Sequence, residues 1–345
     1  MPLIEPSSYH PPFLLRSGNL LTLWGSKLRR FSLQWEPFFT RIRLETPDGD
    51  FIDVDKLPSL PGTQSDRLVI LSHGLEGNSR RKYMRGMAEA FRQAGWDVLA
   101  RNFRGCSGEE NRTEKLYHSG ETDDLHCTVL YAASCGYTRI VLVGFSMGGC
   151  QTLKYLGENP ARVPAAVIGG IGISVPCDLE GSAERLALPS RKLYMEYFLR
   201  TLRQKIRAKA SRFPDSFDPT MLSKIHTFNE FDELYTAPLY GFASARDYWR
   251  RASCAPVLAG IKVPSLIVNA ADDPFLSSGC FPRSLAMQSR LLTLEIPVHG
   301  GHVGFVSSNP QCYWSESRAV EFAEALTVRN PAASEAKKTD SNDFE

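Results

Sequence analysis

The 345-residue sequence lacks several features that would assign it to a specialised class of protein. It has no C-x-x-C pair and no histidine at zinc-ligand spacing from a cysteine, which argues against the common small zinc sites and redox motifs. No segment reaches the roughly 18 apolar residues that suggest a membrane-spanning helix. The net charge is only +2, which argues against a large basic surface for nucleic acid.

A secretory signal is also missing, because prolines and polar residues interrupt the N-terminal stretch MPLIEPSSYHPPFLLRSGNLL. The cysteines are scattered, as expected for reduced thiols in the cytoplasm, where we predict this protein to be. Hydrophobic residues make up 43% and charged residues 23%, which is ordinary for a globular protein. The eight cysteines are Cys106, Cys127, Cys135, Cys150, Cys177, Cys254, Cys280 and Cys312.

From about residue 67, short β-branched runs alternate with longer amphipathic segments, which is typical of βα units around a parallel sheet. Helices are predicted over residues 79–94 and 119–135, each long enough for a crossover. Two earlier runs flank Pro47-Asp48-Gly49 and predict an antiparallel hairpin at the sheet edge. Together these runs predict eight strands, at residues 41–45, 51–55, 67–72, 96–100, 139–144, 165–169, 265–269 and 291–296.

The strand pattern stops between residues 176 and 262, where the composition becomes helical, basic and aromatic. The clearest helix, over residues 191–207, has Tyr194, Phe198, Leu202 and Ile206 on one row. We expect a helical cap whose apolar side packs on the core, walling an apolar acyl pocket, and whose basic side is solvated. Contact of that basic side with anionic lipid head groups is the alternative.

The sequence predicts five segments along the chain. They are an N-terminal extension at residues 1–40, the first part of the core at 41–175, the cap at 176–262, the second part of the core at 263–328 and a disordered tail at 329–345.

The sequence GFSMGG at residues 144–149 places Ser146 between a predicted strand and a predicted helix. This is the context of a nucleophile elbow, a sharp turn that lifts a serine hydroxyl beyond the sheet edge. Small residues at Gly144 and Gly148 let the strand and the helix approach each other. Ser146 is therefore the candidate nucleophile.

A serine hydroxyl needs a histidine to accept its proton and a carboxylate to orient that histidine. His302, in a glycine-rich loop after the last predicted strand, is the preferred base, and His299 is the weaker choice. The acid follows the strand 265–269, where Asp273 is favoured because Pro274 stiffens the turn, and Asp272 stays open as the alternative.

The negative oxygen of an acyl-transfer intermediate needs N–H donors aimed at it. We expect one from the backbone of Met147 at the start of the elbow helix. The second comes from the loop His73-Gly-Leu-Glu-Gly77, where the Leu75 N–H is the predicted donor. His73 precedes this turn, so a structural role is favoured over that of a catalytic base.

Together these segments resemble the α/β-hydrolase superfamily, and within it the YheT-like esterase branch, over about residues 6–326. The resemblance implies a mostly parallel eight-stranded sheet flanked by helices, with a helical cap after the sixth strand and a triad of Ser146, Asp273 and His302. It also implies hydrolysis of short- to medium-chain carboxylic esters or lipids. The segments that carry it are His73-Gly-Leu-Glu-Gly77, Arg101-Asn-Phe-Arg-Gly105, Gly144-Phe-Ser-Met-Gly-Gly149, Ser174-Val-Pro-Cys-Asp-Leu179, Asn269-Ala-Ala-Asp-Asp-Pro-Phe275 and Gly300-Gly-His-Val-Gly-Phe305.

We therefore expect a serine ester hydrolase that forms an acyl-enzyme and uses no metal or other cofactor. Its expected partner is a small ester or lipid substrate, and not nucleic acid. Transfer of the acyl group to an alcohol, through the same residues, is one alternative. A non-catalytic binding protein that keeps the fold is the other.

Overall fold

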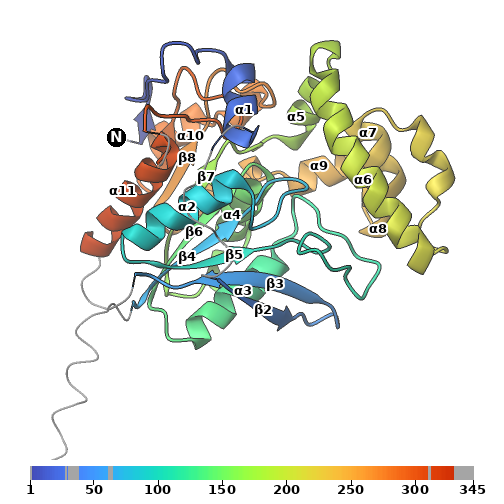
Figure 1. Cartoon of the computed structure of the whole chain (residues 1–345), viewed down its shortest axis with the longest axis horizontal. Helices are drawn as coiled ribbons and strands as arrows, with labels where there is room; N and C mark the ends of the chain where they lie inside the picture. Colours follow the sequence, from blue (N-terminus) through green and yellow to red (C-terminus); the bar gives the residue numbers. More distant parts are fainter. Residues whose placement is uncertain (1, 28, 30–38, 61–64, 310–311, 330–345) are drawn as a thin grey trace, which may run out of the picture.

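The computed structural model describes residues 2–27, 29, 39–60, 65–309 and 312–329. A nine-stranded sheet runs through the described residues in the order β1-β9-β8-β7-β6-β4-β5-β3-β2, with helices on both of its faces (Figure 1). Its strands are β1 (Leu3–Ile4), β2 (Thr40–Glu45), β3 (Phe51–Leu57), β4 (Arg67–Ser72), β5 (Asp97–Arg101), β6 (Arg139–Phe145), β7 (Val167–Ile173), β8 (Ser265–Val268) and β9 (Leu292–Glu295).

The predicted edge hairpin is confirmed, because β2 pairs with β3 in antiparallel register and lies at one end of the sheet. β3 also runs antiparallel to β5, and the other neighbouring strands are parallel. The prediction of eight strands is wrong by one. The strand β1 was missed because its two residues are too few to form an apolar run, and only their parallel pairing with β9 makes them a strand.

Helices cover the sheet in two layers, because successive strand residues point to opposite faces. In β4, for example, Leu68 and Ile70 pack in one buried cluster with α3 and α4, whereas Val69 and Leu71 pack in another with α2 and α11. The helices of the sandwich are α2 (Lys82–Gln93), α3 (Asp123–Ser134), α4 (Met147–Glu158), α10 (Arg283–Gln288) and α11 (Trp314–Arg329), with α1 (Gly18–Lys27) beside α2.

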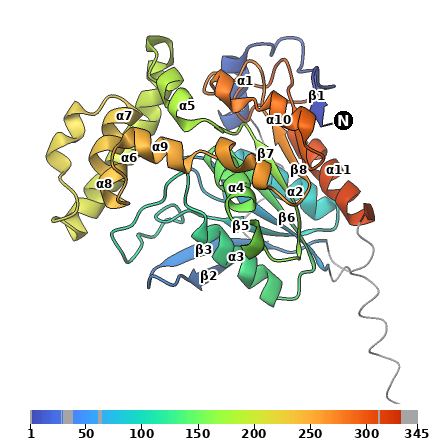
Figure 2. The same cartoon turned by 180° about the vertical axis from the view of Figure 1, so that it is seen from behind.

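The segment of residues 176–262, here named the insert, is helical and contains no strand among its residues, all of which the structure describes. Figures 1 and 2 both show α6, α7 and α8 outside the layered core. A separate apolar cluster, which includes Leu199, Ile206 and Phe231, holds the insert together. Its helices are α5 (Leu179–Leu186), α6 (Lys192–Arg212), α7 (Phe228–Phe231), α8 (Ala237–Leu239) and α9 (Ala245–Ala252).

The expected solvated basic side of the long insert helix includes only some of its cations. Lys205 and Lys209 of α6 are buried, at 9% and 1% exposure. They lie beside Leu202 and Ile206, so the buried side of the helix is wider than its apolar row. The predicted tail 329–345 lies outside the described residues except for Arg329, which ends α11.

Candidate active site

The predicted site residues lie at one edge of the sheet. Parallel strands bring their carboxyl ends to the same edge, and the loops after those ends carry the ligand-binding groups in open α/β sheets. Four parallel strands are involved, and the residues that follow β4, β6, β8 and β9 are Leu75, Ser146, Asp273 and His302, respectively.

Ser146 lies in the sharp turn between β6 and α4, with φ 52° and ψ −119°. Residues other than glycine rarely adopt this backbone conformation, which costs on the order of 1–3 kcal/mol. Its surroundings enforce it, since the Ser146 N–H donates to Ile173 O at 2.8 Å. A Cβ on Gly144 would lie 2.2 Å from Gly148 O, and one on Gly148 would lie 2.4 Å from His73 O. The two glycines are therefore required by the close approach of strand, helix and neighbouring loop.

His302 and Asp273 form a hydrogen-bonded pair, with 2.9 Å between Nδ1 and Oδ2. The Asp273 carboxylate is inaccessible to solvent, and its other oxygen accepts the Phe275 N–H at 2.8 Å. The backbone N–H of His302 donates to the Thr22 hydroxyl of α1 at 2.8 Å. A carboxylate at Nδ1 favours the tautomer that leaves Nε2 free to accept a proton.

Asp272 and His299 form a second pair, with 3.2 Å between Oδ2 and Nδ1. Asp272 also accepts the Gly301 N–H at 2.9 Å, so its role in the described structure is to hold the turn that carries His302. This pair is more exposed than the first. The structure thus joins Asp273, and not Asp272, to His302.

A cavity between the sheet edge and the insert brings the candidate residues together. Its described lining includes Ser146, Met147, Leu75 and His302, whereas His299 and both candidate acids lie outside it. The hydrogen bonds of His302 within the described chain run to Asp273 and Thr22, so its Nε2 has no partner there. In free enzymes the bond between serine and histidine is often long and shortens only with substrate.

The two predicted oxyanion donors also border the cavity. Among the described residues, neither the Leu75 N–H nor the Met147 N–H donates a hydrogen bond. Backbone N–H groups near a protein core are rarely left unpaired, so two of them on one cavity indicate a place for a negatively charged oxygen.

His73 lies below this loop and is fully buried. Its Nε2 accepts the Phe103 N–H at 3.0 Å, so its Nδ1 carries the proton that bonds Gly74 O at 2.7 Å. Burial lowers the pKa of His73 to about 3, because a charged ring would lose its hydration. The ring holds the Leu75 loop and stays neutral, in line with the structural role expected from the sequence.

Sequence reasoning missed an ion pair that connects the insert to the same loop. The Lys205 Nζ of α6 lies 2.8 Å from Glu76 Oε1, and both side chains are under 10% exposed. Glu76 has φ 53°, and its N–H donates to the Tyr117 hydroxyl at 3.0 Å. One feature of the sequence could have indicated this ion pair: Lys205 is adjacent to Ile206, which lies on the side of the helix that faces the core.

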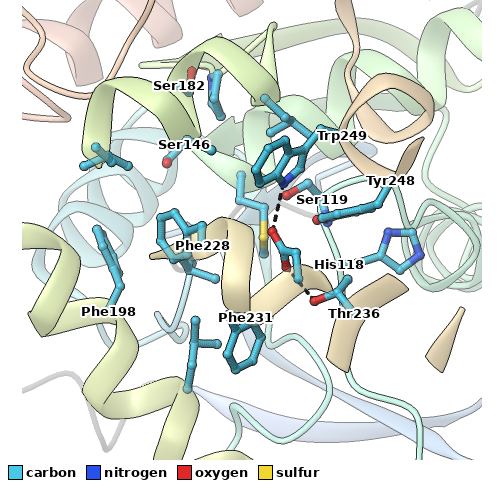
Figure 3. Close-up of a pocket in the computed structure, with 18 of the residues that line it drawn as sticks. His118, Ser119, Ser146, Ser182, Phe198, Phe228, Phe231, Thr236, Tyr248 and Trp249 are labelled. Atoms are coloured by element: carbon cyan, nitrogen blue, oxygen red, sulfur yellow. Dashed lines mark hydrogen bonds between the residues drawn. The ribbon is translucent and has the colours of Figure 1, made fainter. Parts of the chain in front are cut away.

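The insert contributes aromatic side chains to the cavity. Figure 3 shows Phe198, Phe228, Phe231 and Trp249 around the space that Ser146 faces. Tyr240 and Tyr248 also line the cavity, as does one carboxylate, Asp232, which sequence reasoning passed over.

Neither metal-binding clusters nor membrane-spanning helices are found in the described parts of the chain. Over residues 2–27, 29, 39–60, 65–309 and 312–329, no group of three or more His, Cys, Asp or Glu side chains could hold a metal ion. In the same ranges, no helix combines the length and the apolar character needed to cross a bilayer.

Comparison with known proteins defines the class of this fold and site. The family model of the alpha/beta hydrolase fold matches residues 67–308, which is more than half of the chain. The chain therefore belongs to the α/β-hydrolase fold family.

Individual relatives are similar over most of their length. The protein YheT of Escherichia coli K12, named as a candidate esterase, is 34% identical over 300 residues, which cover 85% of this chain and 86% of YheT. The phospholipase ABHD3 of Homo sapiens is 29% identical over 312 residues, covering 88% of this chain and 75% of the relative. Among solved structures, the Pyrococcus furiosus esterase Pf2001 superposes with a TM-score of 0.57 at 19% identity, covering 86% of this chain and 98% of the esterase.

Proposed function

We propose that this α/β-hydrolase hydrolyses carboxylic esters with Ser146 as nucleophile, His302 as base and Asp273 as the orienting acid. One observation carries the proposal: Ser146, His302 and the residues of two unpaired backbone N–H groups line a single cavity, and buried Asp273 bonds His302 from behind it. The names of relatives as an esterase, a phospholipase and a monoacylglycerol lipase support an enzyme that acts on ester bonds.

The reaction begins when His302 Nε2 takes the Ser146 proton while the serine oxygen attacks the ester carbonyl. The Leu75 and Met147 N–H groups stabilise the negative oxygen that forms. His302 then gives the proton to the leaving alcohol, and the acyl group stays on Ser146. Water, deprotonated by His302, then attacks the acyl carbonyl, and His302 returns the proton to the departing Ser146 oxygen as the acid is released. Asp273 stabilises the imidazolium in each half of the cycle.

The substrates in this proposal are short- to medium-chain acyl esters or lipids. We infer that the insert, residues 176–262, acts as a cap, since its aromatic rings form one wall of the cavity above Ser146. Apolar walls favour an acyl chain because burying apolar surface is favourable by about 25 cal/mol per Å².

The test is the hydrolysis of p-nitrophenyl esters from acetate to palmitate by the wild type and by Ser146→Ala. We expect a preferred chain length in the wild type and a loss of at least about 10⁴-fold in kcat in the variant. Ser182→Ala is the matched control, because Ser182 lines the same cavity but donates its hydroxyl to Asp178 O at 2.7 Å. Full activity in Ser146→Ala would refute the proposed nucleophile.

The choice of acid is tested by a pair of neighbouring variants. Asp273→Asn should lower kcat by up to about 10⁴-fold, because the amide would favour the wrong histidine tautomer. Asp272→Asn should have the smaller effect, since this carboxylate bonds the turn and not His302. The reverse order would assign the triad acid to Asp272.

Two alternatives to hydrolysis can be tested, and acyl transfer uses the same residues but differs in what reaches the acyl-enzyme. Acyl transfer predicts that added alcohol is converted into a new ester by the wild type, which product analysis would detect. A non-catalytic binding protein predicts that a fluorophosphonate does not label Ser146 in the folded chain.

A further inference from the structure

The cavity contains a feature that ester hydrolysis by the triad does not use. Among its described lining residues Asp232 is the only carboxylate, surrounded mainly by aromatic and aliphatic side chains. It begins the π-helical turn Asp232–Thr236, between α7 and α8. Single π-helical turns occur frequently at functional sites.

Two hydrogen bonds from the protein hold the Asp232 carboxylate in place. Its Oδ1 accepts the Thr236 hydroxyl at 2.6 Å, and its Oδ2 accepts the Trp249 indole N–H at 2.8 Å. Figure 3 shows these bonds as dashed lines to Thr236 and Trp249. A carboxylate offers about four acceptor positions, so two remain after these bonds.

The surroundings do not neutralise this carboxylate. Lys205, a cation in the cavity lining, is bonded to Glu76, and the side chains that donate to Asp232 are neutral. Burial raises the pKa of Asp232 to about 6, because the charged form loses hydration. Asp232 is partly exposed and lines the cavity, so a donor group of a ligand can use the acceptor positions that remain.

We propose that Asp232 is a substrate-binding residue that accepts a hydrogen bond from a donor group of the ester. This rests on the proposed ester hydrolysis at Ser146 and narrows its substrate class. Because a carboxylate accepts and a plain alkyl chain has nothing to donate, the preferred substrates carry a hydroxyl or an ammonium group besides the ester. The aromatic rings around Asp232 then enclose the apolar part of the same molecule.

The test compares p-nitrophenyl esters of ω-hydroxy, ω-ammonium and plain alkanoic acids of four to twelve carbons. We expect that at one chain length a donor-bearing ester exceeds the plain ester in kcat/KM by about tenfold or more. In Asp232→Leu, which keeps the branched shape of the side chain but removes the acceptor, this ratio should fall to near one. The hydroxyl and ammonium series identify which donor the site takes.

Thr236→Val and Trp249→Phe are the matched controls, because each removes one bond to Asp232 and leaves its carboxylate. If Asp232 only braces the insert, all three variants change activity on both ester series together and the ratio stays constant. A wild type that shows no preference at any chain length, or a ratio that survives in Asp232→Leu, would overturn the proposal.

Binding is measured separately so that a failure of hydrolysis does not hide the result. Calorimetry on Ser146→Ala gives the Kd for each hydroxylated or ammonium ester and its plain counterpart. A tighter Kd for the donor-bearing ester that is lost in Ser146→Ala/Asp232→Leu supports the subsite whether or not the wild type turns over. Equal Kd values in Ser146→Ala would contradict it, while absent hydrolysis with unequal Kd values would refute the reaction alone.

Discussion

At the scale of single residues, the site depends on histidines with contrasting environments. Both His302 and His118 line the cavity, but His302 is bonded to Asp273, whereas the His118 ring lies against the rings of Tyr240, Phe242 and Tyr248. His118 Nδ1 accepts the Gly120 N–H at 3.1 Å, which requires that nitrogen to be unprotonated. Burial lowers the pKa of His118 to about 3. The native state therefore keeps this ring neutral.

Because the His118 ring stays neutral in the native state, we expect its contribution to the free energy of unfolding to depend on pH. The variant His118→Phe should lack this dependence. Below pH 6.5 the unfolded chain binds a proton at His118 that the native state does not, so stability is lost as the pH falls. Relative to the variant, the wild type should lose about 1.4 kcal/mol per pH unit once the pH is well below 6.5. Denaturant unfolding at pH 7, 6 and 5 measures this difference.

The control replaces His226, whose side chain is exposed and hydrated in both states. His226→Phe should leave the pH slope of the wild type unchanged. Parallel curves for wild type and His118→Phe would show that the native state accommodates the charged ring.

At the scale of elements, helix α6 and the loop after β4 are joined through Lys205 and Glu76. Lys205 Nζ also lies 3.2 Å from Cys106 Sγ and 4.6 Å from the centre of the Tyr117 ring. Since Glu76 follows Leu75 directly, the insert restrains the backbone whose N–H is the predicted oxyanion donor.

Lys205→Met should therefore lower kcat by about tenfold, with a smaller change in KM, because a displaced donor weakens transition-state stabilisation most. Lys209→Met is the matched control from the next turn of the same helix. Lys209 is also buried, but it donates to Thr113 O at 2.6 Å, away from the loop. Steady-state kinetics on the folded fraction of each variant makes the comparison.

A similar loss of kcat in Lys205→Met and Lys209→Met would contradict this prediction, as would a loss of stability with unchanged kcat in Lys205→Met. Either result would mean that the ion pair stabilises the insert without affecting the oxyanion donor. Glu76→Gln adds a further comparison, because it keeps the shape of the loop residue and removes its charge.

At the scale of the whole molecule, the burial of two lysines changes the charge that α6 presents to its surroundings. Arg203 is paired with Glu196 at 2.7 Å. Among the described residues of α6, the exposed cations without a bonded partner are Lys192, Arg200 and Arg207. Lipid-binding basic segments usually gather four to eight cations, each contributing about 1 kcal/mol.

We therefore expect little co-sedimentation of the protein with anionic vesicles at physiological salt. The lipid-contact alternative predicts binding that rises with the fraction of anionic lipid, falls with added salt and is lost in Arg200→Gln/Arg207→Gln. Such a result would assign the exposed side of α6 to a membrane surface. Co-sedimentation at low and high salt with neutral and anionic vesicles separates the two outcomes.

The sequence by itself determined the sheet, apart from β1, and the position of the elbow. Both depend on neighbouring residues: short β-branched apolar runs form the strands, and the close approach at Ser146 admits only glycine at positions 144 and 148. The order of serine, acid and histidine after successive strands was also readable, because parallel strands end at one edge.

Only the tertiary structure decided which acid meets which histidine and which polar groups enter the cavity. Asp272 and Asp273 are neighbours in sequence, and their orientation depends on a loop that packs against α1. Lys205 and Asp232 were hidden for the same reason, since their burial comes from partners at Glu76 and Trp249 and not from their own helices. Local steric rules act between adjacent residues, whereas burial and pairing act between segments that meet only when the chain has folded.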